Sequence, residues 1–305
     1  MVIVKKKCLL VAELGINHNG DFNLLKKLTV SAFENGADFV KLQLRTPRVC
    51  VPKSEWNKPR EWFDGTVVSY IEYKEKIELT EEQLFLYDKF VTENFGKQKW
   101  FASVWDMPSL ERLTKFDVPY IKIPSALITN IELVQACIDT NTPIVVSTGM
   151  STEEEISRCI KLFPSEYDLT ILSCTSSYPC VDEEVNLRKI EALWNMFNEY
   201  PKIYIDTDNS WTWDAAVLER KYGFSSHSKS PFIPIAANTR YDLNMIEVHF
   251  TLDRAMKGTD HAASLEPAGL ALVARELKRL PIIIGDGQIA VYPSEELARK
   301  KLRGY

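Results

Sequence analysis

Short apolar runs recur eight times along the chain, and stretches with helical periodicity separate most of them. The runs are continuous rather than alternating, which is typical of parallel strands that are buried on both faces. Eight strand–helix units predict a closed (β/α)8 TIM barrel. The runs cover residues 8–14, 38–44, 99–105, 119–125, 142–149, 168–176, 221–228 and 245–251.

The chain has 305 residues, a length that suits one barrel and leaves little for a second unit. We therefore expect a single domain over residues 1–305, with a helix that opens at Thr80 in a capping box. The stretch 200–221 is longer than the usual connection between a barrel helix and the next strand. It predicts either an extra strand outside the barrel or a lid.

Charge and composition exclude several classes of protein. A net charge of -5 offers nucleic acid no basic face. No run approaches the ~20 apolar residues of a membrane span, and the first apolar run ends at Glu13, too early for a signal peptide. The six cysteines are scattered without a CxxC pair, which is typical of reduced thiols. We expect a cytoplasmic protein with neither nucleic-acid nor membrane partners.

Polar side chains gather at the carboxyl ends of the predicted strands, where TIM barrels carry their active sites. Each is weak evidence alone, but together they predict one polar mouth. The set comprises Glu13, Asn17, His18, Lys41, Gln43, Ser103, Asp106, Lys122, Ser125, Ser147, Thr148, Thr175, Ser176, Tyr178, Ser225, His227 and His249.

Lys41 and Lys122 lie within apolar strands, where an ammonium is costly to desolvate unless an anion compensates it. Two such lysines among serines indicate a phosphate or carboxylate ligand. There are two alternatives. One lysine could point outward or pair with Glu13, or a single lysine of lowered pKa could form a Schiff base.

His227 and His249 fall at corresponding positions of adjacent strands. Two imidazoles there could share a metal ion with water, Glu13 and substrate oxygens, although hydrogen-bonded structural histidines are the alternative. The polar segment 257–267 carries Asp260 and His261, and predicts either an active-site loop across the mouth or a solvated loop.

Several motifs resemble the catalytic barrel of the sialic acid (N-acetylneuraminate) synthase family. They occur in the family's order from residue 8 to about residue 296: VAELGINHNGD, FVKLQ, YIKIPS, VVSTGM, LSCTSSYPC with VNLRKIEAL, SSHS, and EVHFTLDRAMKGTDHAASLEP. The wider group makes nonulosonic acids, including legionaminic and pseudaminic acids and spore-coat sugars. The 257–267 loop is most similar to the sialic acid branch.

The resemblance implies condensation of phosphoenolpyruvate with the open-chain aldehyde of an N-acyl hexosamine such as N-acetylmannosamine, with release of phosphate. It also implies a divalent cofactor, Mn²⁺, Mg²⁺ or Co²⁺, which would activate the aldehyde as a Lewis acid. By this resemblance, the catalytic residues are Glu13, Lys41, Lys122, His227 and His249, of which His227 and His249 hold the metal. Phosphoenolpyruvate would meet Lys41, Ser103, Lys122, Ser125, Ser147 and Ser225, and the sugar Glu13, Gln43, Tyr178 and Asp260.

The sequence departs from the family pattern in three places. Leu127 stands where we align an acidic residue that helps to hold the sugar. The stretch 200–221 brings Trp211 and Trp213, which could stack on a sugar or cover an apolar patch. We also expect no antifreeze-like C-terminal domain, the unit that lends an arginine across the family's dimer, so a homodimer and the acceptor sugar both stay open. The alternative functions are a non-catalytic sugar-binding or scaffold barrel of a polysaccharide pathway, and a synthase that acts on a different aldose.

Overall fold

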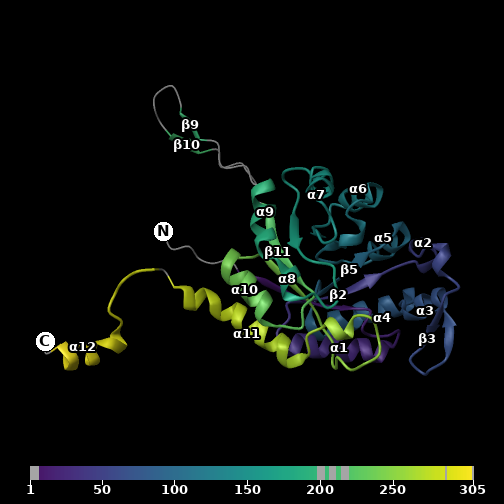
Figure 1. Ribbon diagram of the computed structural model, residues 1–305, viewed down its shortest axis with the longest axis horizontal. Helices are drawn as coiled ribbons and strands as arrows, with labels where there is room; N and C mark the ends of the chain where they lie inside the picture. Colours follow the sequence, from purple (N-terminus) through teal and green to yellow (C-terminus); the bar gives the residue numbers. More distant parts are fainter. Residues whose placement is uncertain (1–6, 198–202, 206–210, 214–219, 286, 304–305) are drawn as a thin grey trace.

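Eight parallel strands close into a barrel, as the sequence predicts, in the order β1-β12-β11-β8-β7-β6-β5-β2. The computed structural model describes residues 7–197, 203–205, 211–213, 220–285 and 287–303, with backbone only at 203–205 and 211–213. Figure 1 shows the strands surrounded by helices. The barrel strands are β1 (Leu9–Gly15), β2 (Phe39–Leu44), β5 (Trp100–Val104), β6 (Ile121–Ile123), β7 (Ile144–Ser147), β8 (Leu169–Ser173), β11 (Lys221–Ser226) and β12 (Met245–His249).

Several of the surrounding helices begin where the sequence supplies a capping side chain. The side chains of Asp21, Thr80 and Thr152 each accept a backbone N–H in the first turn of the following helix, and Thr80 forms a capping box with Gln83. The helices are α1 (Phe22–Glu34), α4 (Glu81–Phe95), α5 (Met107–Leu113), α6 (Ile131–Asp139), α7 (Glu153–Ile160), α8 (Asp182–Val185), α9 (Arg188–Phe197), α10 (Phe232–Tyr241) and α11 (Pro267–Ile284).

Burial on both faces explains why the strands read as unbroken apolar runs. Every residue of β5, β7, β8 and β12 is buried, because one face of each strand packs inside the barrel and the other under the helices. Polar residues within these strands therefore have no route to solvent except through the lumen. That constraint makes each of them a candidate for the site.

An excursion between β2 and α4 builds up one side of the barrel mouth. It contains α2 (Pro47–Cys50), a hairpin of β3 (Pro59–Glu61) and β4 (Val67–Ser69), and α3 (Tyr70–Ile77). Tyr73 and Ile77 of α3 pack against Ile16, which follows β1. An ion pair of 2.9 Å joins Glu61 of the hairpin to Lys257, so the excursion contacts the 257–267 loop.

The stretch 200–221 contains two short antiparallel strands, β9 (Ile203–Ile205) and β10 (Trp211–Trp213), outside the barrel sheet. It connects the end of α9 to the start of β11, and a helix-to-strand connection lies at the end of the barrel opposite the catalytic mouth. Figure 1 draws the pair away from the barrel body. The expectation of a strand outside the barrel is thus met by a pair. A lid over the mouth is inconsistent with this position. The side chains of Trp211 and Trp213, and with them the expected stacking or covering role, lie outside the described part of the chain.

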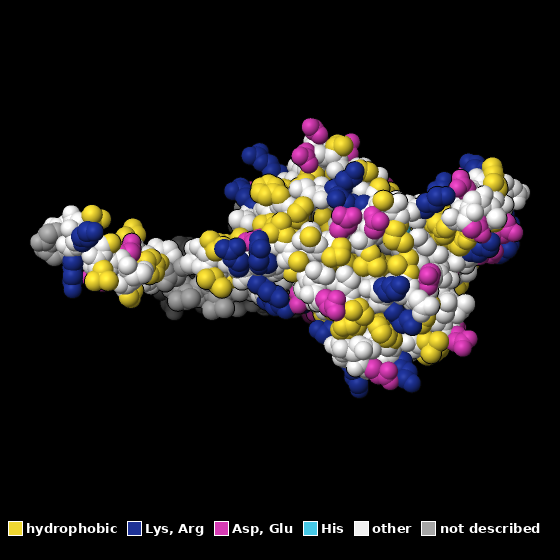
Figure 2. Space-filling view, turned by 90° about the horizontal axis from the view of Figure 1, so that it is seen from below, with side chains coloured by type: hydrophobic (Ala, Val, Ile, Leu, Met, Phe, Trp, Pro, Cys, Tyr) yellow, Lys and Arg dark blue, Asp and Glu magenta, His cyan; other side chains and the backbone are white. Residues whose placement is uncertain are grey.

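Beyond α11, the helix α12 (Glu296–Arg303) lies apart from the barrel body in Figures 1 and 2. Leu297 and Leu302 on it are exposed, among Lys and Arg side chains. Among the described residues, no helix combines the length and the apolar character needed to cross a bilayer.

Candidate active site

The barrel lumen holds a cavity of about 150 Å³ at the carboxyl ends of the strands, with room for several waters or a small organic anion. The structure brings together there all the residues assigned from the family resemblance except Asp260, whereas the lining leaves out five residues of the predicted polar mouth: Asn17, His18, Asp106, Thr148 and Thr175. The lining includes Glu13, Lys41, Gln43, Ser103, Trp105, Lys122, Ser125, Ala126, Ser147, Met150, Cys174, Ser176, Tyr178, Ser225, His227, Glu247 and His249.

Lys41 lies at the centre of a network of buried polar contacts. Strand register places it beside Glu13, and its ammonium lies 2.7 Å from Glu13 Oε2 while it donates to Ser103 Oγ at 2.8 Å. Burial alone would lower the pKa of Lys41, but the carboxylates of Glu13 and Glu247 outweigh burial and raise it. Lys41 is therefore a fully charged ammonium, which argues against its use as a Schiff-base amine.

Glu247 is a site residue that the sequence reasoning missed. Its two carboxylate oxygens lie 3.6 Å from Lys41 Nζ and 3.6 Å from Lys122 Nζ. Burial would raise the pKa of Glu247, yet the two ammonium groups hold it well below its usual range. The sequence did contain the information needed to find Glu247. Side chains two residues apart on a strand share a face, and Glu247 is two residues before His249.

Lys122 differs from Lys41 in its surroundings. Within the described part of the chain it pairs only with Glu247, and burial lowers its pKa despite that carboxylate, with the charge of Lys41 adding to the effect. The alternative of a lysine paired with Glu13 is what the structure shows for Lys41. Two carboxylates thus balance two ammonium groups, and charge alone does not demand an anionic ligand.

Hydroxyl groups supply a second reason to expect a ligand. Ser147 Oγ is buried without a hydrogen-bond partner, as is Glu247 Oε2. Ser125 Oγ accepts from the N–H of Gly149 at 3.0 Å, and Ser225 Oγ donates to Glu247 at 3.3 Å. Buried polar groups are rarely left unpaired, so the orphaned atoms indicate a missing polar partner in the cavity.

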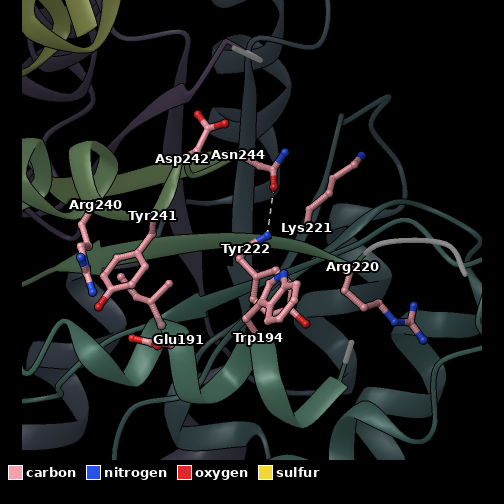
Figure 3. Close-up of a pocket in the computed structure, with 10 residues that line it drawn as sticks. Glu191, Trp194, Arg220, Lys221, Tyr222, Arg240, Tyr241, Asp242 and Asn244 are labelled. Atoms are coloured by element: carbon pink, nitrogen blue, oxygen red, sulfur yellow. Dashed lines mark hydrogen bonds between the residues drawn. The ribbon is translucent and has the colours of Figure 1, made fainter. Parts of the chain in front are cut away.

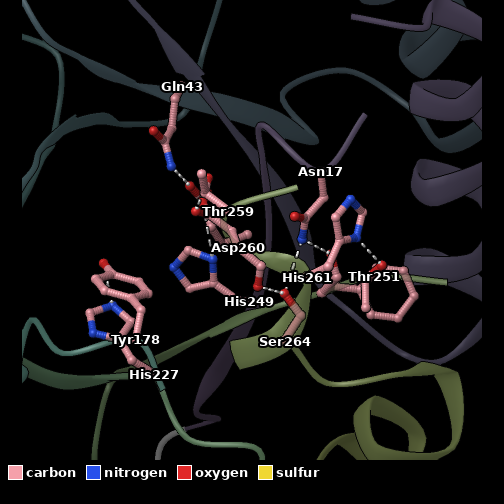
Figure 4. Close-up of polar contacts among 12 residues, drawn as sticks. Asn17, Gln43, Tyr178, His227, His249, Thr251, Thr259, Asp260, His261 and Ser264 are labelled. Carbon is pink, nitrogen blue, oxygen red and sulfur yellow. Dashed lines mark hydrogen bonds and ion pairs between the residues drawn. The ribbon is translucent and has the colours of Figure 1, made fainter. Parts of the chain in front are cut away.

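The two predicted metal ligands, His227 and His249, lie next to each other and to Tyr178 in Figure 4. Their ring centres are 5.2 Å apart. His227 Nδ1 lies 2.5 Å from the carbonyl oxygen of Thr175, to which it donates, so its Nε2 carries the lone pair and accepts from the hydroxyl of Tyr178 at 3.0 Å. Burial, together with His249, lowers the pKa of His227 to about 3, which keeps the imidazole neutral, as ligation requires.

His249 Nδ1 is buried without a hydrogen-bond partner and lies 3.9 Å from Asp260 Oδ2. The arrangement suits a metal held by two neutral imidazoles, with water or substrate oxygens as further ligands. No group of three or more His, Cys, Asp and Glu side chains that could hold a metal occurs among the residues the structure describes.

The positions assigned to the sugar fall into different environments. Gln43 Nε2 donates to Glu13 Oε1 at 2.9 Å, whereas Tyr178 stacks on His227 at 4.1 Å between ring centres. Asp260 lies outside the cavity lining, and its loop is tied to the strand ends: Thr251 Oγ1 lies 2.7 Å from His261 Nδ1, and Asn17 donates to Ser264 (Figure 4). The loop therefore lies beside the mouth.

Leu127 has no place in the cavity. It ends a short 3-10 turn after β6, and its half-buried side chain packs against the hydrophobic core. Among the cavity-lining residues, this turn contributes Ser125 and Ala126.

A larger cavity of about 630 Å³ lies at the opposite end of the barrel, between α9, the start of β11 and the end of α10 (Figure 3). Its cations are largely engaged: Lys221 pairs with Asp168 at 2.6 Å, and Arg220 donates to the carbonyls of residues 163, 164 and 167. None of the predicted site residues lines it. The smaller lumen cavity is therefore the candidate active site.

Residues 28–207 and 213–289 match the NeuB family. The chain belongs to the NeuB family. Its NeuB relatives include the N,N'-diacetyllegionaminic acid synthase of Campylobacter jejuni, which is 31% identical over 97% of this chain and 84% of its own. The human N-acetylneuraminate-9-phosphate synthase is 28% identical over 97% of this chain and 76% of its own.

Among solved structures, the NeuB barrel described here is similar to the N-acetylneuraminic acid (sialic acid) synthetase of Leptospira borgpetersenii, solved in complex with citrate. The TM-score is 0.77 at 26% identity, with 99% of this chain and 94% of that chain covered. The family resemblance and the barrel inferred from the sequence are thus both confirmed.

Proposed function

We propose that this NeuB-family protein condenses phosphoenolpyruvate with the aldehyde of an N-acyl hexosamine to give a nonulosonic acid and phosphate, with a divalent ion such as Mn²⁺, Mg²⁺ or Co²⁺ as cofactor. The observation that carries the proposal is the lumen itself, where two ammonium groups, an unpartnered serine hydroxyl and two imidazoles line one small cavity. Two relatives, a synthase of N,N'-diacetyllegionaminic acid and a synthase of N-acetylneuraminate 9-phosphate, support the product class.

Phosphoenolpyruvate fits the side of the cavity formed by the lysines and serines. Lys122 has donors to spare, and Ser147 offers a hydroxyl without a partner, so both can bind the carboxylate or phosphate oxygens. Lys41 and Ser103 are already connected by a hydrogen bond, so together they offer phosphoenolpyruvate a second, rigid point of contact. Holding both anionic groups aligns C3 of the alkene with the aldehyde.

The aldehyde fits the opposite side, near the imidazoles. His227 Nε2 and His249 Nδ1 are the atoms that would hold the metal ion, which when bound supplies a Lewis acid for the aldehyde oxygen. The hydroxyl of Tyr178 must leave His227 Nε2 for this to happen. Asp260, beside His249, is then placed to accept hydrogen bonds from sugar hydroxyls.

Glu13 is placed to handle the water that completes the reaction. Attack by C3 leaves an electron-poor C2, to which water must add before phosphate departs by C–O cleavage. Lys41 and Gln43 fix both carboxylate oxygens of Glu13, which can orient that water and accept its proton. No other carboxylate in the cavity lining has this combination, since Glu247 lies between the two lysines.

The proposal is tested by incubating the protein with Mn²⁺, phosphoenolpyruvate and a panel of N-acyl hexosamines while phosphate release is followed. We expect release with at least one aldose and none without metal. Lys122→Ala should abolish phosphoenolpyruvate binding, and His249→Ala should abolish metal binding. Absence of release with every aldose would favour a non-catalytic sugar-binding barrel.

A further inference from the structure

Arg45 and Trp105 form a stacked pair at the edge of the lumen cavity. Arg45 directly follows β2 and Trp105 directly follows β5, its neighbour in the barrel. The guanidinium carbon lies 4.1 Å from the centre of the Trp105 ring, and Trp105 lines the cavity. Stacking on an aromatic face fixes the plane of the guanidinium and leaves its edge available for hydrogen bonds.

Both partners carry a buried N–H group without an acceptor. These are Arg45 Nε and Trp105 Nε1, whereas the terminal Nη2 of Arg45 donates to Gln43 Oε1. Since Gln43 in turn donates to Glu13, a chain of contacts connects the guanidinium with the centre of the lumen. Guanidinium and indole groups can only donate, so the missing partner must offer acceptor oxygens.

Two cations, Arg45 and Lys74 of α3, lie near each other beside the lumen without an ion-pair partner among the described residues. The two cations are close enough that the charge of Arg45 helps to lower the pKa of Lys74. Burial, with Arg45, lowers the pKa of Lys74 to about 8. Three acids are near: Asp260 acts on Lys74, Glu78 accepts from the backbone N–H of Arg45 at 3.0 Å, and Asp106 accepts from the backbone N–H of the next residue, Thr46, at 2.6 Å. Burial raises the pKa of Glu78 to about 7, so Glu78 offsets the cations only in part.

We propose that Arg45 is a specificity-determining residue, and that the acceptor sugar carries a carboxylate or phosphate group remote from its aldehyde, bound by Arg45 and the indole N–H of Trp105. The inference rests on the proposed function and narrows its substrate class. Gln43, which resembles a sugar-side residue of the family, lies between Arg45 and Glu13, so a sugar whose aldehyde lies near the imidazoles can extend towards this pair.

The test compares three acceptors that differ at one carbon: N-acetylmannosamine, its 6-phosphate and its 6-carboxylate. We expect one of the charged acceptors to exceed the neutral one in kcat/KM by roughly 10- to 100-fold, the range for a hydrogen-bonded charge. The advantage should shrink as salt is added. The better of the two charged acceptors identifies the group. Equal kcat/KM for all three would overturn the inference and leave the proposed function standing.

Substitution shows whether Arg45 is responsible. Arg45→Met should lower kcat/KM for the charged acceptor far more than for the neutral one. Arg45→Lys should keep only part of the advantage of the charged acceptor, because lysine lacks the several planar N–H donors of the guanidinium. Arg48→Met is the matched control, since Arg48 is exposed and pairs with Glu75 at 2.6 Å. A uniform loss with all three acceptors would overturn the assignment.

If no aldose released phosphate, the proposed function would fail separately. Calorimetric titration of wild type and Arg45→Met with the same three sugars, in the presence of phosphoenolpyruvate, would still decide this inference. Selective binding of a charged sugar by the wild type alone supports it, and equal binding overturns it.

Discussion

The ammonium of Lys41 lies 2.7 Å from Glu13 Oε2, and the two side chains are only 2% and 1% exposed. Each charge would cost several kcal/mol to bury alone, so each is tolerated because of the other. The polar centre of the lumen is therefore built into the folded protein before any ligand binds.

This pairing predicts how stability responds to substitution. Glu13→Gln leaves Lys41 with Glu247 at 3.6 Å as its remaining carboxylate, and should lower the free energy of unfolding by about 3 kcal/mol. The double variant Glu13→Gln/Lys41→Met should be more stable than Glu13→Gln alone, because it no longer buries two ammonium groups against the single carboxylate of Glu247. Urea denaturation of the wild type, Glu13→Gln, Lys41→Met and the double variant measures both effects. Losses that simply add would show that the two charges are not coupled.

The contact between Tyr178 and His227 predicts a change in metal affinity. The tyrosine hydroxyl donates to Nε2, the atom assigned to the metal. Tyr178→Phe removes this competing hydrogen bond and should tighten Mn²⁺ binding by roughly 3- to 10-fold, as measured by calorimetry. Tyr167→Phe is the control, because that hydroxyl donates to the carbonyl of Thr142. Weaker binding by Tyr178→Phe would mean that the hydroxyl supports the metal site.

Gly258 predicts a selective defect in the 257–267 loop. Its φ is +151°, and a Cβ there would come within 2.5 Å of His261 Cδ2 and 2.9 Å of Asn19 Oδ1. Gly258→Ala should displace Asp260, and so raise the KM for the sugar while the KM for phosphoenolpyruvate changes little. Gly269→Ala in α11, where the nearest atoms are 3.5 Å away, should alter neither. An equal rise in both KM values would contradict the role given to the loop.

His18 predicts a dependence of stability on pH. It is buried, and burial lowers its pKa to about 4 from an ordinary 6.5. The unfolded chain therefore takes up the proton first, and stability falls as the pH drops from 6.5 towards 4, by up to ~1.4 kcal/mol per pH unit. In His18→Gln, the loss of unfolding free energy between pH 6.5 and 4.5 should be smaller by about 2 kcal/mol. Parallel pH profiles for both proteins would show that His18 does not titrate as its burial requires.

The barrel could be predicted from the sequence because buried parallel strands leave an unbroken apolar signal. The first and last residues of the strands could not be predicted so well. The run 119–125 shortens to Ile121–Ile123, since Pro119 and Pro124 have no N–H to give to a neighbouring strand. Most site residues could be predicted because polar residues in or just beyond the strands were examined. Glu247 was missed because it lies inside β12, and finding it requires stepping back two residues along the strand from His249.

Contacts between distant loops were the least predictable. The stacking of Tyr178 on His227, and of Arg45 on Trp105, depends on how chain segments leave different strands. No local sequence pattern predicts such contacts between side chains from different strand ends. The same holds for Leu127, whose side chain turns to the core rather than to the cavity.

Glu247, held between Lys41 and Lys122, has a thermodynamic consequence for ligand binding. With Glu13 it makes the lumen electrically neutral, so a phosphoenolpyruvate molecule would enter with several negative charges and meet no net positive charge. In a low-dielectric enclosure such an excess is unfavourable unless a cation enters as well. Anion and divalent ion should therefore each increase the affinity of the other, by the same factor in both directions.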